Sequence, residues 1–214
     1  MSIKNSIELF ERAVQDPLAQ PDQLACMLDG FFEGKLSATP FHAGPLYDEH
    51  SNASKAGLKA LVARGVLTHG GQERCSSKDT PQRGYLAGSF IVPEGATWKE
   101  VVNMFEATGM CYAASYADGR HAVVRSAGRG ALDEARNMHA QDLLNILERE
   151  RGTSDFFVTY DGVVPFTNVY VEMDVFNLKR FGESVDFCMW DPSWSATGES
   201  VEEALLRSLH VARM

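Results

Sequence analysis

The sequence predicts an α+β fold: a central mixed or mostly antiparallel sheet with helices packed on it. Three observations lead to this class. Two amphipathic helical patterns open the chain, β-α-β pieces follow, and strand-like runs suited to antiparallel pairing come after them. Runs of helix and runs of strand in this order are typical of helices gathered on an antiparallel sheet.

The chain has 214 residues, enough for one large domain or two small ones. It contains no internal repeat, no low-complexity tract and no linker long enough to separate two units. We therefore interpret residues 1–214 as a single domain in three consecutive parts. These are an N-terminal helical part (1–36), a loop-helix-strand segment that carries the motifs (37–92), and a remainder with a hairpin, a long helix, strands and a C-terminal helix (93–214).

The N-terminal part predicts two helices, at residues 5–15 and 21–36. Asn5 and Glu8 have the spacing of a capping box, and prolines at positions 17 and 21 stop the first helix and start the second. Helical spacing also predicts which side chains are buried. They are Ile7, Leu9, Phe10, Val14, Leu24, Met27, Leu28, Phe31 and Phe32.

The next part predicts a loop, a helix and two strands. In order, the elements are a loop at 37–51, a helix at about 52–64, a short strand at 66–68, a turn at 69–73 and a strand at 82–92. Leu58, Leu61 and Val62 form the apolar side of the helix, and Gly65 ends it. A loop as long as the first one inside a compact domain is often functional.

Two capping boxes mark helices in the last part of the chain. Thr97 and Glu100 precede a helix at 98–108, and Ser200 and Glu203 precede the C-terminal helix. A two-residue turn signal at Asp118-Gly119 predicts a hairpin over 110–125. The other predicted elements are a helix at about 132–150 and strands at 155–160, 167–175 and 184–189. Because the strand at 167–175 alternates as a half-exposed strand does, a homo-oligomer paired through it is one alternative.

Composition excludes several classes of function. A net charge of −9 and a pI of about 5.1 argue against broad binding to nucleic acid backbone and against attraction to an anionic membrane. No apolar run is long enough for a membrane span, and no signal peptide pattern opens the sequence. The four cysteines show no C-x-x-C spacing, so we expect most of them to be reduced core residues of a soluble cytoplasmic protein.

Polar residues at two strand ends form the leading candidate site. The expected ligand-binding residues are Thr68, Gln72, Gln82, Arg83 and Tyr85. Arg83 is suited to a two-pronged grip on a phosphate or carboxylate, and the glutamine amides are suited to reading a base or amide edge. The structural alternative is a network in which Arg83 pairs with Asp48 or Glu49 and the glutamines hold loop backbone.

His50 is the best acid–base candidate, because a histidine beside the carboxylates of Asp48 and Glu49 can exchange protons near neutral pH. Its structural alternative is an exposed position at a helix N-terminus. His42 and His69 do not have a diagnostic metal-ligand spacing with it, so we expect no metal and no cofactor. Cys75 beside Arg74 is a weaker candidate for a reactive thiol.

Four pieces of the N-terminal ninety residues resemble a family of uncharacterised bacterial and phage domains. They are LDGFFEGKL (28–36), GPLYDEHS (44–51), GVLTHGGQE (65–73) and PQRGYLAGSF (81–90). The family pattern reads T-x-x-S-Q-P-G followed by Q-R-A-x-V-x-G-F, and the likeness depends mainly on Thr68, Gln72, Gln82, Arg83 and Gly88. Here Gly71 to Arg74 replace the Ser-Gln-Pro-Gly, so a function shared with the family cannot use that serine. The resemblance implies a bacterial or phage protein and locates a site without naming an activity.

The sequence therefore favours a binding or interaction protein, of a regulatory or defence-related type. It would hold a small anionic ligand or a partner segment at the 68–85 sheet edge. The signatures of P-loop enzymes, dinucleotide-binding folds, zinc metalloproteases and serine hydrolases are all absent. The alternative is an enzyme for a nucleotide-like or phosphorylated substrate, with His50 as the acid–base group and Arg83 as the anion clamp.

Overall fold

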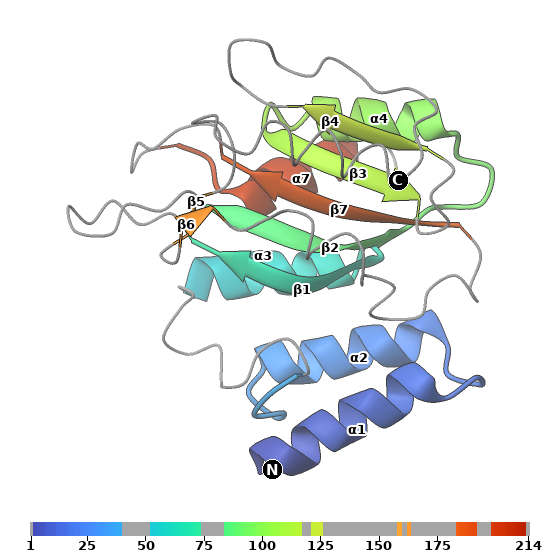
Figure 1. Cartoon of the computed structure of the whole chain (residues 1–214), viewed down its shortest axis with the longest axis vertical. Helices are drawn as coiled ribbons and strands as arrows, with labels where there is room; N and C mark the ends of the chain where they lie inside the picture. The colour runs from blue at the N-terminus through green and yellow to red at the C-terminus, as the bar shows by residue number, and fades with distance from the viewer. Residues whose placement is uncertain are drawn as a thin grey trace.

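The computed structural model describes residues 2–39, 52–73, 84–116, 121–125, 158–159, 162–163, 183–191 and 198–212. The elements in these ranges are α1 (Ile3–Gln15), α2 (Pro21–Phe32), α3 (Asn52–Val62), β1 (Val66–Gln72), β2 (Tyr85–Ile91), α4 (Trp98–Glu106), β3 (Cys111–Tyr116), β4 (Ala122–Arg125), β5 (Val158–Thr159), β6 (Gly162–Val163), β7 (Ser184–Trp190) and α7 (Val201–Ala212). They confirm the predicted α+β class, with helices packed on a central antiparallel sheet (Figure 1).

The five-stranded sheet has the order β1-β2-β7-β3-β4, and every neighbouring pair is antiparallel. Strands β2 and β3 flank β7 and so run parallel to each other, with α4 connecting them. This is a β-α-β unit split by a strand from near the end of the chain. All residues from Ser184 to Trp190 are buried, which makes β7 the centre of the sheet. Among the described strands, β5 and β6 form a separate two-stranded sheet.

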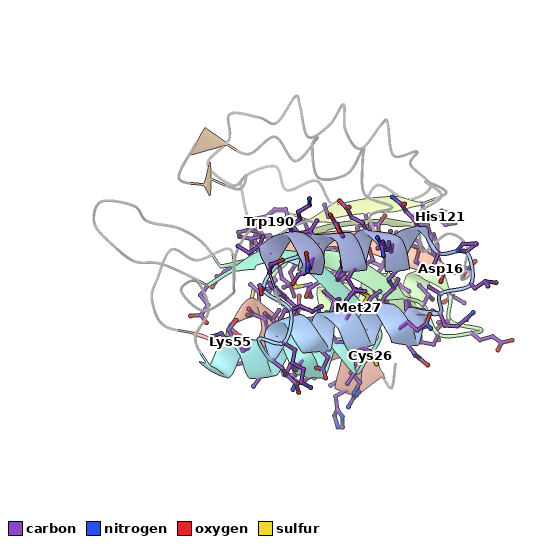
Figure 2. All side chains as sticks on the ribbon, turned by 90° about the horizontal axis from the view of Figure 1, so that it is seen from below. Asp16, Cys26, Met27, Lys55, His121 and Trp190 are labelled. Atoms are coloured by element: carbon purple, nitrogen blue, oxygen red, sulfur yellow. The ribbon has the colours of Figure 1, made fainter. Side chains whose placement is uncertain are left out.

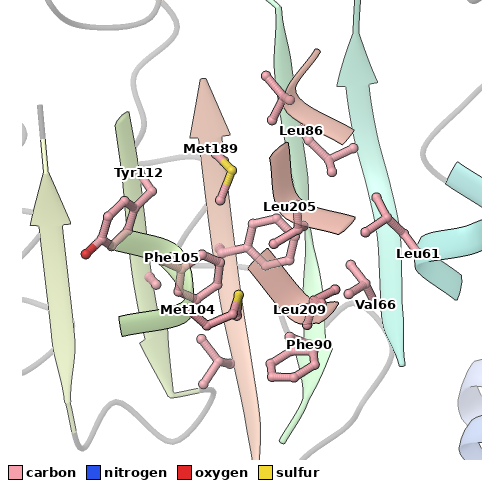
Figure 3. Close-up of a cluster of buried hydrophobic side chains, with 14 of the residues drawn as sticks. Leu61, Val66, Leu86, Phe90, Met104, Phe105, Tyr112, Met189, Leu205 and Leu209 are labelled. Atoms are coloured by element: carbon pink, nitrogen blue, oxygen red, sulfur yellow. The ribbon is translucent and has the colours of Figure 1, made fainter. Parts of the chain in front are cut away.

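Helices α3, α4 and α7 cover one face of the sheet and enclose the main hydrophobic core (Figure 1; Figure 3). Phe105 of α4 lies at its centre, with its ring centroid 5.3 Å from that of Tyr112 and 5.4 Å from that of Phe187. Other members are Leu61, Val66, Leu86, Phe90, Met104, Met189, Leu205 and Leu209. On each strand the core residues occupy every second position, as expected for side chains on one face of a sheet.

The two N-terminal helices pack beside the edge strand β1 (Figure 1). Their second, smaller cluster joins Phe10, Leu24 and Leu28 to Val62 of α3 and Leu67 of β1. The predicted burial of these α1 and α2 residues is confirmed. The prediction was wrong for Leu9, which is 44% exposed, and Cys26 is also exposed rather than a core residue. Both side chains are accessible to solvent, Leu9 on α1 and Cys26 on α2.

The ends of three helices follow local rules. The Thr97 backbone N–H donates to Glu100 Oε2 at 2.7 Å, and the Glu203 N–H donates to Ser200 Oγ at 3.2 Å, so both predicted capping boxes are confirmed. The prediction of Asn5 as a cap was wrong. Helix α1 begins two residues earlier, and Ser2 Oγ accepts from the Asn5 N–H at 3.3 Å.

Polar contacts fix α7 against its two neighbours. Ser54 Oγ of α3 donates to the buried Glu202 carboxylate at 2.9 Å. Arg207 donates to the carbonyl oxygens of Ala107 and Thr108, at 3.0 and 3.2 Å, just past the end of α4. The same guanidinium makes two bonds to the Glu199 carboxylate, each 2.9 Å long. The guanidinium thus sits at the negative end of the α4 dipole, where a cation is favourable.

Several predicted elements can be compared with the structure. The predicted hairpin is confirmed as β3 and β4, whereas the predicted turn at 69–73 is wrong, because β1 continues to Gln72. The predicted strand at 155–160 is observed as the two residues of β5. The helix at 132–150, the strand at 167–175 and the turn at Asp118-Gly119 lie outside the described residues.

Gly88 is expected to be intolerant of any side chain. A Cβ there would lie 2.7 Å from the Leu67 carbonyl oxygen and 3.2 Å from Thr68 Cα, both backbone atoms of β1. We expect Gly88→Ala to lower the free energy of unfolding by about 1–3 kcal/mol, because β1 must shift. Urea denaturation would measure this.

Gly30→Ala is the matched control. It adds the same methyl group inside α2, where the nearest atom would be 3.9 Å away, and we expect stability to be unchanged or raised by up to about 1 kcal/mol. Equal losses in the two variants would show that the close β1–β2 approach is unimportant.

Candidate functional site

The predicted site lies at the end of the sheet where β1 stops and β2 starts. The two strands pair from Val66 opposite Phe90 to Gln72 opposite Tyr85, so residues 73–84 connect them at this end. We call it the hairpin mouth. Of the predicted ligand-binding residues, Gln72 and Tyr85 are therefore placed together by the register. Gln82, Arg83 and His50 lie outside the described residues.

A β-bulge at His69 changes which predicted residues share a face. Thr68 pairs with Gly88 and Gln72 pairs with Tyr85, with a register shift between Thr68 and Gly70. Gly88 and Tyr85 are three residues apart on β2, so they belong to opposite faces of the sheet. Without the bulge, positions 68 and 72 would share a face. The bulge separates Thr68 from the hairpin mouth.

Thr68 is buried, with 5% of its surface exposed, on the face covered by the helices. It occupies the space beside Gly88, in line with Val66 of the main core. Tyr112 and Tyr116 belong to the same face and are also buried, so both are packing residues of the main core. Tyr112 donates to Glu106 Oε1 at 2.9 Å, and burial raises the pKa of its phenol.

The hairpin mouth is anchored by the end of β7. Tyr85 pairs with Trp190, which in turn pairs with Cys111 of β3, and the Asp191 N–H donates to the Gly84 carbonyl at 2.9 Å. Trp190 is completely buried and Asp191 is 4% exposed. Trp190 is therefore a packing residue at this end of the sheet. Trp194 lies outside the described residues.

Sequence reasoning missed a buried polar row on the face away from the helices. Ser89 Oγ donates to Asp186 Oδ1 at 2.6 Å, and both residues are less than a tenth exposed. Ser184, two positions from Asp186 on the same face, is buried, and its hydroxyl has no hydrogen-bond partner among the described residues. The signal was present in the strand SVDFCMW, where serine and aspartate alternate with valine and phenylalanine. It was uninformative because an exposed strand face shows the same pattern.

The described cysteines differ in access. Cys111 and Cys188 are buried, and burial raises the pKa of the Cys188 thiol to about 12, so this thiol is a poor nucleophile at neutral pH. Cys26 is exposed on α2 (Figure 2), and Cys75 lies outside the described residues. Within the described ranges, no three His, Cys, Asp or Glu side chains are grouped to hold a metal ion. Among the described helices, none combines the length and apolarity needed to cross a membrane.

Comparison with known proteins adds no assignment. No protein-family model matches this chain, and no curated protein sequence matches it either. The resemblance to the bacterial and phage family therefore stays a prediction. The geometry of the sheet and its surroundings is therefore the basis for a proposed function.

The Cys188 thiol should make stability fall at alkaline pH. Its folded-state pKa of about 12 lies above the ordinary value of 9.0, so the unfolded chain loses this proton first as pH rises. Stability from this group is complete below about pH 9 and is lost between pH 9 and 12, by roughly 1.4 kcal/mol per pH unit once the unfolded thiol is ionised. Melting temperatures measured across this range should show the decline.

Cys188→Ala should make that decline shallower even if its melting temperature at pH 7 is lower, and the buried Tyr112 phenol should account for part of the decline that is left above pH 10. The exposed-thiol control, Cys26→Ala, should keep the wild-type slope. An unchanged slope in Cys188→Ala would contradict the assignment.

Proposed function

We propose that this protein is a binding protein that holds a small anionic molecule at the hairpin mouth. The observation that carries the proposal is the antiparallel register of β1 and β2. It closes the hairpin with Gln72 opposite Tyr85, and the connection that returns to Tyr85 ends in Gln82-Arg83-Gly84. The hairpin mouth therefore has four candidate groups in its sequence: the amides of Gln72 and Gln82, the phenol of Tyr85 and the guanidinium of Arg83.

The chemistry of these groups supports an anion. Arginine offers a planar set of donors that matches phosphate or carboxylate oxygens, and glutamine side chains add neutral donors and acceptors. Tyr85 is partly buried, and a tyrosine side chain offers a ligand both an apolar ring and a polar hydroxyl. Nucleotides and phosphorylated metabolites have the matching anion and a polar or aromatic body.

The attachment of the start of β2 to the central strand supports recognition at this end. The pairing of Tyr85 with Trp190 and the bond from Asp191 to Gly84 tie the start of β2 to the buried central strand. A group attached to a packed scaffold loses little freedom on binding, which favours affinity. The described residues supply no accompanying nucleophile and metal set, so binding is proposed here and not catalysis. The enzyme alternative depends on His50 and stays a prediction.

A thermal-shift screen tests the proposal with nucleotides and sugar phosphates as probes. A ligand at a hundred times its dissociation constant should stabilise the fold by roughly 2.7 kcal/mol. Arg83→Ala should abolish the shift, and Arg83→Lys should weaken it, because lysine keeps the charge without the two-pronged geometry.

Arg64→Ala is the matched control, since Arg64 is an exposed arginine just before β1, at the far end of the strand. It should retain the full shift. A shift that survives Arg83→Ala would contradict the proposal, as would the absence of any shift with anionic probes. A large loss of stability in unliganded Arg83→Ala, with no ligand effect, would assign Arg83 to the structural network instead.

A further inference from the structure

A second concave feature lies at the opposite end of β1. It is a pocket of about 370 Å³ between α2, the end of α3 and the start of β1. Its lining includes Asp22, Ala25 and Asp29 of α2, Lys59 of α3, Ala63 just past α3, and Ile91 of β2. This volume falls in the range of small-molecule sites. The length of β1 separates it from the hairpin mouth by roughly 20 Å.

The floor of the pocket is apolar and preformed. Leu67 is completely buried, Val62 is 7% exposed, and both belong to the cluster that joins α1 and α2 to the sheet. Ala25 and Ile91 complete this surface as partly buried members of the same cluster. Because these side chains are already held by core packing, an apolar ligand body would displace water without rearranging the protein.

The rim of the pocket carries an excess of negative charge. Asp22 and Asp29 contribute two carboxylates, and Lys59 contributes one ammonium. Lys59 Nζ is already engaged, at 2.7 Å from Glu33 Oε1 and 3.8 Å from Asp29 Oδ1. Hydrogen bonds from Lys35 and Lys59 lower the pKa of Glu33 to about 2, so this carboxylate stays charged and keeps Lys59 occupied.

Asp22 is the unmatched charge. No basic side chain in the described part of the chain forms an ion pair with it, in contrast to Asp29. The two helix ends at the pocket, the N-terminus of α2 and the C-terminus of α3, have dipoles of opposite sign and offset each other. The side-chain charges therefore determine which ligand charge suits the pocket, and they favour a cation.

We propose that this pocket binds a small organic cation: a primary ammonium group on an apolar body. The apolar body would lie against the accessible parts of Ala25 and Ile91, and the ammonium group would reach the carboxylate of Asp22. This ligand class is opposite in charge to the one proposed for the hairpin mouth. The inference is independent of that proposal, because it shares no residue with it.

Cys26 provides a direct reporter of occupancy. It lines the pocket, is exposed, and shares one side of α2 with Asp22 four residues before it and Asp29 three residues after it. Figure 2 shows its place on α2. Cys111 and Cys188 are buried and should react far more slowly. Replacing Cys75 by serine leaves Cys26 as the thiol that is labelled first.

The experiment measures the rate at which iodoacetamide alkylates Cys26 in the full-length Cys75→Ser protein. Phenethylamine and 3-phenylpropionate are the probes, since they have similar aromatic bodies and opposite charges. Phenethylamine should slow the alkylation in a saturable way, and 3-phenylpropionate should not. Equal protection by the two probes, or none by the amine, would overturn the proposal.

Two variants locate the effect. Asp22→Asn should raise the amine concentration for half-protection by roughly threefold to fivefold, the upper end of the range for an exposed ion pair. Glu11→Gln removes an equally exposed carboxylate from α1 and should leave protection unchanged. Protection that is insensitive to Asp22→Asn would contradict the assigned role of that carboxylate.

Ala63→Phe tests the pocket itself. Ala63 is exposed and lines the pocket, so a larger side chain should block the ligand without disturbing the core. We expect the protection by phenethylamine to disappear while the melting temperature stays near that of the parent protein. Full protection in this variant would place the amine elsewhere. Neither result depends on Arg83, so this inference and the proposed function can fail separately.

Discussion

The sheet depends on the insertion of β7 between β2 and β3. Those two strands are connected by α4 and run parallel, but they are not paired with each other. Seven register pairs from β7 to β2 and six to β3 supply the hydrogen bonds between the two halves of the sheet. Since β7 lies far along the chain from both partners, closing the sheet requires long-range contacts that form at a high entropic cost.

Strand β7 is buried on both faces, but the side chains on its two faces differ in polarity. On the helix-covered face, Phe187 packs against Phe105 in an apolar core. On the other face, Asp186 and Ser89 are buried as a hydrogen-bonded pair, which is needed because a buried carboxylate without a partner would be costly. Strand β7 thus combines an apolar packing face with a polar one. Its last residues also anchor the hairpin mouth through Trp190 and Asp191.

The edge pair of β1 and β2 carries a candidate site at each end. At one end, the connection between the strands brings arginine and glutamine to the start of β2. At the other, α2 and α3 meet the strands over an apolar floor with acidic side chains on its rim. Helix α2 creates the second feature, because it packs beside β1, which has a neighbouring strand on one side only among the described residues. The same packing that protects an edge strand therefore produces a pocket.

Features that depend on residues close together in the chain could be predicted from the sequence alone. The capping boxes at Thr97 and Ser200 and the apolar sides of α2 and α3 depend on residues three or four positions apart, so they could be predicted. The pairing of β7 with both β2 and β3 became known from the tertiary structure. The same holds for the bulge at His69, which separates Thr68 from Gln72, and for the burial of Asp186. These features depend on pairing and covering by segments distant in sequence, about which a local pattern of side chains carries no information.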